Sequence, residues 1–155
     1  MAVAECILFV TCILTDFYHQ PQAKVKQITP IVCKASKKYN IRVKYPLAIM
    51  YYETRFIHKT RSKTNDVGIM QLHCPKETRG LTCNKCDIKK LSCNIDRGMR
   101  LLYLRKKKYQ SKYDKSYKWL QHYNFYSKGY ARKIYSKAIA SIKICKKNID
   151  TKKIK

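Results

Sequence analysis

Apolar side chains recur at steps of three and four residues through most of this chain, and this spacing constrains the fold more than any other feature. The clearest run consists of Ala131, Ile134, Tyr135, Ala138, Ile142 and Cys145. Similar runs lie between Lys24 and Asn40, from Ile95 toward Tyr109, and from Tyr117 to Tyr123. A step close to 3.6 residues places each set on one face of an α-helix. The sequence therefore predicts a mainly α protein.

The length of 155 residues suits a single domain with a modest core. We divide the chain into an apolar N-terminal segment (residues 1–22), a helical domain (24–145) and a basic tail (146–155) that we expect to be frayed.

The apolar run from Val3 to Leu14 is shorter than a membrane span, which needs about twenty residues. It is typical of the apolar part of an export signal and predicts an exported protein, periplasmic or extracellular. However, Glu5 interrupts the run and no Lys or Arg precedes it. A helix that packs in the core is the alternative.

One glutamate, Glu53, lies in an apolar setting. Pro46 is typical of a first helical residue, so we expect a helix to begin near it. At helical spacing, the apolar neighbours on the face of Glu53 are Ile49, Met50 and Phe56. Withdrawing a carboxyl from water raises its pKa and keeps it protonated, as a general acid requires. The alternative is a glutamate that faces solvent or pairs with a neighbouring cation.

Five motifs follow one another in order along the chain. They are Glu53-Thr54-Arg55-Phe56, Gly68-Ile69-Met70-Gln71-Leu72, Asn94-Ile95-Asp96-Arg97-Gly98, Tyr123-Asn124 and Tyr130-Ala131-Arg132-Lys133-Ile134. This set resembles the lytic transglycosylase SLT family of the lysozyme-like superfamily, over about residues 28–140. The members associated with secretion and conjugation machinery are the most similar.

The resemblance implies a lysozyme-like helical domain with a short β-hairpin in the region from Asn65 to Leu72. It implies a monomer that cleaves the β-1,4 bond between N-acetylmuramic acid and N-acetylglucosamine in peptidoglycan glycan strands. Glu53 would be the general acid and then the base, leaving 1,6-anhydromuramyl ends, with no metal or other cofactor. The residues expected to bind the sugar are Met70, Gln71, Tyr123, Asn124 and Tyr130. Gly68 would form the turn that presents Met70 and Gln71, and secretion or conjugation machinery would be a further partner.

Two further residues support this interpretation, and three positions depart from the family pattern. Asn94 is expected to cap the helix that follows it, and Gly98 to let a neighbouring helix come close. His122 stands where the family has alanine, and Phe125-Tyr126 replaces a small residue and glycine. The sequence therefore does not determine the width of the sugar groove.

Other activities remain as alternatives. A hydrolytic lysozyme of the same fold would need a second carboxylate, for which Asp66 is the nearby candidate. A catalytically inactive wall-binding protein is another alternative. Lys and Arg total 35 against 9 Asp and Glu, a formal charge of +26, which favours binding to polyanions such as anionic wall polymers. Nucleic-acid binding would explain this charge but not the five ordered motifs, so we disfavour it.

Eight cysteines suggest cross-links. Four of them, Cys74, Cys83, Cys86 and Cys93, lie in an irregular loop next to His73. Two disulfides are the interpretation that suits an exported protein, while a zinc site and free thiols are the alternatives. We expect Cys33 and Cys145 to join the first and last helices of the domain, while Cys6 and Cys12 fall in the N-terminal segment.

Overall fold

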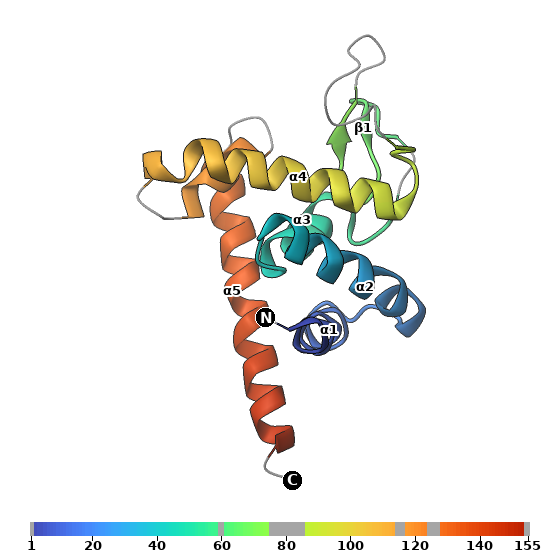
Figure 1. Ribbon diagram of the computed structural model, residues 1–155, viewed down its shortest axis with the longest axis vertical. Helices are drawn as coiled ribbons and strands as arrows, with labels where there is room; N and C mark the ends of the chain where they lie inside the picture. The colour runs from blue at the N-terminus through green and yellow to red at the C-terminus, as the bar shows by residue number, and fades with distance from the viewer. Residues whose placement is uncertain (1, 59–60, 75–85, 114–116, 124–127, 154–155) are drawn as a thin grey trace.

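A computed structural model describes residues 2–58, 61–74, 86–113, 117–123 and 128–153 (Figure 1). The protein is mainly α-helical, as predicted. The helices are α1 (Val3–Cys12), η1 (Ile13–Phe17, a π-helix), α2 (Gln22–Tyr39), α3 (Lys44–Thr54), α4 (Leu91–Tyr109), η2 (Ser111–Tyr113), η3 (Tyr117–His122) and α5 (Lys128–Lys153). Two short strands, β1 (Asp66–Val67) and β2 (Leu72–His73), complete the fold.

Helix α3 lies at the centre of the molecule, with α5 along one side, α4 across the top and α2 between α4 and α1 (Figure 1). Four consecutive residues of α3 are completely buried: Leu47, Ala48, Ile49 and Met50. A helix that is apolar on every face is buried in a core, so no face of α3 is exposed to solvent over this turn. The last turn of α3, which carries Glu53, therefore directly follows this buried segment.

The sequence predicted the end of α2 correctly, but the start of α3 and the position of Phe56 differ from the prediction. Helix α2 ends as expected at Asn40, whose φ of 49° is left-handed, a common helix termination. Helix α3 begins at Lys44, so Pro46 is its third residue; a proline is tolerated there because first-turn N–H groups have no partner within the helix. Arg55 and Phe56 are both left-handed, so Phe56 lies beyond the helix of Glu53 rather than on its face.

The structure confirms the short hairpin expected in the region from Asn65 to Leu72. β1 and β2 pair antiparallel, with Asp66 opposite His73 and Val67 opposite Leu72. The four residues between the strands form the turn that begins with Gly68.

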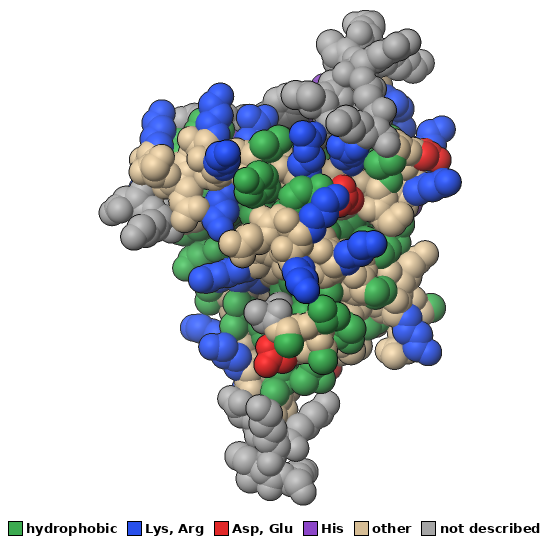
Figure 2. Space-filling view, in the orientation of Figure 1, with side chains coloured by type: hydrophobic (Ala, Val, Ile, Leu, Met, Phe, Trp, Pro, Cys, Tyr) green, Lys and Arg blue, Asp and Glu red, His purple; other side chains and the backbone are tan. Residues whose placement is uncertain are grey.

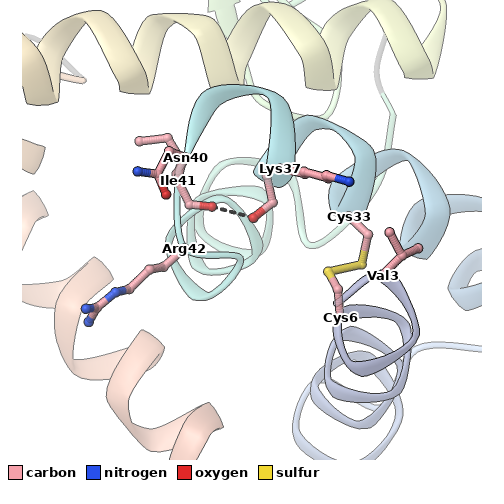
Figure 3. A pocket seen from close by; sticks show the side chains of 8 residues that line it. Val3, Cys6, Cys33, Lys37, Asn40, Ile41 and Arg42 are labelled. Carbon is pink, nitrogen blue, oxygen red and sulfur yellow. Dashed lines mark hydrogen bonds between the residues drawn. A yellow bond between two sulfur atoms is a disulfide. The ribbon is translucent and has the colours of Figure 1, made fainter. Parts of the chain in front are cut away.

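The N-terminal segment is an integral part of the structure. Cys6 of α1 is joined to Cys33 of α2 (Figure 3), and Cys12 is joined to Cys145 of α5. The predicted Cys33–Cys145 bridge is therefore wrong, because each of these cysteines is bonded to a cysteine of α1. Helix α1 packs on the core through Cys6, Val10 and Cys12, while Val3, Ile7 and Leu8 are exposed. The export role and the cleavage of residues 1–22 stay predictions.

Disulfides also account for the described part of the cysteine-rich loop. Cys86 is bonded to Cys93, and Cys74 is disulfide-bonded too. Because these sulfur atoms are in S–S bonds, the zinc alternative is wrong for them. Cys83 lies outside the described residues.

The basic tail is more ordered than predicted. Helix α5 continues past Cys145 to Lys153, and Asn148 Nδ2 donates to Asp16 Oδ2 at 2.8 Å. The expectation that the chain frays from residue 146 is therefore wrong for this stretch. Over the residues described, we find no helix with the length and apolar character needed to cross a bilayer.

Candidate active site

Glu53 is half-buried in the last turn of α3 and is held by a tyrosine from the other end of the chain. The hydroxyl of Tyr130, in the first turn of α5, donates to Glu53 Oε1 at 2.6 Å. A short bond to an acidic oxygen is among the strong hydrogen bonds of proteins. Packing of α3 against α5 thus fixes the orientation of the carboxyl.

A second tyrosine joins this cluster. The Tyr123 hydroxyl donates to the Met70 carbonyl at 2.9 Å. Burial raises the pKa of Tyr123, and the negative charge of Glu53 raises it further. The pKa of Tyr130 is also raised, first by burial and then by the charge of Glu53. Both phenols therefore stay protonated and remain hydrogen-bond donors at neutral pH.

The turn next to this cluster needs a glycine for two reasons. Gly68 has a φ of +75°, where residues with a side chain are strained. A Cβ at this position would lie 2.1 Å from Nδ2 of Asn94. The structure thus supports both the left-handed backbone and the close approach expected of Gly68.

Asn94 of α4 holds the turn through side-chain hydrogen bonds. It is completely buried inside α4, its Oδ1 accepts from Met70 N at 3.0 Å, and its Nδ2 donates to Val67 O at 2.9 Å. The expectation that Asn94 caps the helix is wrong, because Lys90 occupies the cap position. Gly98, one helical turn later, makes room for a side chain rather than a helix, since a Cβ there would lie 2.2 Å from Met70 Sδ.

The predicted sugar-binding residues differ in burial and in how they lie relative to Glu53. The Met70 side chain is fully buried against α4, so this residue offers its backbone carbonyl to Tyr123. Gln71 is half-buried with a φ of 46°, and its Nε2 donates to Gly68 O at 2.8 Å. Tyr123 and Tyr130 lie with Glu53, while Asn124 falls outside the described residues.

Two residues that sequence reasoning missed connect the end of α3 to the turn. Thr54 Oγ1 lies 3.1 Å from the Ile69 carbonyl. The His58 ring accepts from Ile69 N at Nδ1, at 3.0 Å, and contacts the Lys89 carbonyl through Nε2, which therefore carries the proton. Neither contact leaves a local sequence signal, because each depends on a residue of another element.

Asp66, the candidate second carboxylate, is engaged within the hairpin. Its oxygens accept from Ser62 Oγ and Thr64 Oγ1 and contact His73 Nδ1 at 3.0 Å. These contacts describe a residue that organises a turn.

Comparison with known families assigns the chain. A family model described as the transglycosylase SLT domain matches residues 30–145. The chain belongs to the SLT transglycosylase family. SLT domains have the lysozyme-like fold and are lytic transglycosylases that cleave peptidoglycan, so they act on the cell wall, in the periplasm or outside the cell. The search of curated proteins and the search of solved structures returned no match. The SLT match begins within α2, so α1 and η1 lie outside it.

Proposed function

We propose that this protein is an exported lytic transglycosylase that cleaves the bond between N-acetylmuramic acid and N-acetylglucosamine and leaves 1,6-anhydromuramyl ends. The proposal assigns the general acid and the subsequent base to Glu53. The observation that carries it is the hydrogen bond from Tyr130 to Glu53 Oε1, within a cluster that also contains Tyr123 and the turn.

The arrangement suits one carboxyl acting twice. Tyr130 donates to Oε1 and so holds the carboxyl in one orientation, and in the proposed reaction the protonated Glu53 gives its proton to the glycosidic oxygen. The carboxylate that results is stabilised by the same phenol, which its raised pKa keeps protonated. Glu53 then takes the proton of the muramyl 6-hydroxyl as that oxygen closes the anhydro ring.

The contacts of Asp66 favour the transglycosylase over a hydrolase. A two-carboxyl glycosidase needs a second carboxylate that activates water or attacks the sugar. The Asp66 oxygens already accept hydrogen bonds from Ser62 and Thr64, in the loop that leads into the hairpin. A single-carboxyl reaction makes no demand on Asp66.

The test is mass spectrometry of the soluble products released from peptidoglycan by the protein and by Glu53→Gln. The amide is nearly isosteric with the carboxyl but cannot shuttle a proton, so we expect turnover to fall by at least about a thousandfold while wall binding persists. Asp66→Asn is the matched control and should still release anhydromuramyl ends.

Each contrary outcome points to a different correction. Glu53→Gln activity within tenfold of the parent would remove Glu53 from its role. Reducing muramyl ends that disappear in Asp66→Asn would identify a lysozyme. Binding to the wall with no product from folded protein would identify an inactive wall-binding protein.

A further inference from the structure

A basic groove that includes Tyr52, the residue before Glu53, takes no part in the proposed reaction. Its volume is about 440 Å³, and it lies between α3, α5 and η1. The side chains that concern us are Phe17, Tyr52, Arg132, Lys133, Ser136 and Lys137. We call this set the basic groove.

The basic groove adjoins the candidate acid through an aromatic pair. Tyr52 precedes Glu53 on α3, and its ring packs edge-on against Tyr130, with ring centroids 6.3 Å apart. Arg132 and Lys133 follow Tyr130 by two and three residues on α5. The basic groove is therefore connected to Glu53 through the contact of Tyr52 with Tyr130 and the hydrogen bond of Tyr130 to the carboxyl.

The cations of the basic groove are positioned by aromatic rings. Lys137 Nζ lies 4.8 Å from the centroid of Tyr51 and 5.4 Å from that of Phe17. Lys133 Nζ lies 6.0 Å from the centroid of Tyr52. Contacts of this kind hold an ammonium group while leaving its hydrogen-bond donors available.

These cations are not neutralised within the described part of the chain. The ion pairs of Lys38 with Asp96 and of His73 with Asp66 involve no residue of the basic groove. The acidic residues nearest in sequence to the basic groove are Asp16 and Glu53. Asp16 accepts hydrogen bonds from Asn148 and Thr15, and Glu53 accepts one from Tyr130. The basic groove thus offers three cations and a hydroxyl to an anionic ligand from outside.

We propose that the basic groove binds the carboxylates of the acidic peptides that peptidoglycan carries on its muramyl residues. The inference rests on the proposed function, because the glycan must bind at Glu53 for its peptide to reach the basic groove. The peptide is attached to the sugar that contributes to the scissile bond, and its negative charge complements Arg132, Lys133 and Lys137. A volume of this size suits a short peptide segment.

The experiment compares kcat/KM on glycan strands that keep their peptides with kcat/KM on strands stripped by an amidase. We expect the protein to prefer peptide-bearing strands by about tenfold, since two or three exposed charge pairs contribute roughly threefold each. The preference should fall toward one as salt rises to about 0.5 M, because salt screens exposed charges.

The variant Lys133→Gln/Lys137→Gln should bring the ratio of the two kcat/KM values close to one. Lys26→Gln/Lys34→Gln removes the same charge from exposed positions on α2 and should keep the ratio of the parent. Because Lys137 packs on two rings, Arg132→Gln/Lys133→Gln, which alters exposed side chains alone, is a second variant that should give the same result.

Binding to the inactive Glu53→Gln protein supplies an independent measurement. Calorimetry should show tighter binding of the disaccharide-peptide than of the bare disaccharide, with the difference lost when Lys133 and Lys137 are also replaced. Equal turnover of both strands, an unchanged ratio in the groove variants, or an equal loss in the α2 control would overturn the inference while leaving the proposed function intact. Polyphosphate that competes as well as the peptide would also overturn it, since the basic groove would then be a general anion site. No turnover of either strand would count against the proposed function itself.

Discussion

Tyr18 places a phenol in the core without a hydrogen bond. Its ring packs against Phe17, Tyr51 and Phe56, with centroids 4.8 to 5.0 Å away. Its hydroxyl has no partner among the described residues. An unpaired buried hydroxyl costs about 1–3 kcal/mol of folding free energy. Burial, together with the nearby phenol of Tyr51, also raises the pKa of Tyr18.

Removing that hydroxyl should stabilise the protein. We expect Tyr18→Phe to raise the free energy of unfolding at pH 7 by about 1 kcal/mol, because the ring stays and the unpaired group goes. The gain should widen above about pH 10, where the unfolded chain of the parent loses the Tyr18 proton while the folded state keeps it, so the parent loses stability as pH rises. Urea unfolding at pH 7 and pH 10.5 measures both effects, with exposed Tyr103→Phe as the control. A less stable variant at pH 7 would show that the hydroxyl has a partner.

At the scale of elements, Asn94 joins α4 to the hairpin turn. We expect Asn94→Ala to lower the free energy of unfolding by about 2–4 kcal/mol, because Met70 N and Val67 O lose their partner inside the protein. It should also lower kcat, since the Met70 carbonyl that positions Tyr123 belongs to the same turn. Asn148→Ala, at the far end of α5, is the control. It should cost about 1 kcal/mol and leave kcat unchanged, whereas equal effects of the two substitutions would refute this role for the turn.

Periodicity predicted the helices well because burying one face of a helix leaves its mark within a few residues. It failed where the deciding contact is distant in sequence. Asparagine is a residue type typical of helix caps, but the carbonyl that accepts a hydrogen bond from Asn94 belongs to Val67, 27 residues away. Phe56 continues the spacing of the Glu53 face, yet the helix ends at Thr54, and Arg55 and Phe56 are both left-handed. The motif resemblance singled out Glu53 and Tyr130, and the hydrogen bond between them joins residues that are 77 positions apart.

At the scale of the molecule, the cysteines could be counted but not paired from the sequence. Cys33 and Cys145 do lie on the first and last helices of the matched domain, as expected. The sequence did not reveal that α1 lies against both helices and binds each of them separately. Pairing depends on which elements pack together, and the apolar pattern of α1 is also typical of an export signal.

Loss of the Cys12–Cys145 bridge should be the most damaging of the described disulfide deletions. It closes a loop with a sequence separation of 133, against 7 for Cys86–Cys93. The chain-entropy model assigns about 4–5 kcal/mol to loops of the former size and much less to the latter. We expect urea unfolding of Cys12→Ala/Cys145→Ala to show this larger loss, with Cys86→Ala/Cys93→Ala as the comparison. A similar loss in both variants would contradict the argument.

The positive charge is spread over α2, α4 and α5 on the face seen in Figure 2, with few acidic side chains between. A surface of this kind attracts many polyanions at long range. The discrimination that we propose must therefore come from the position of the basic groove beside Glu53, and not from the total charge.

The bond between Cys12 and Cys145 also decides how the protein responds to mechanical force. Tension applied to the chain before Cys12 and after Cys145 would pass through the sulfur atoms and bypass the 133-residue loop that contains the candidate active site. An enzyme tethered at its ends while it worked on a stretched polymer would keep its catalytic geometry under load.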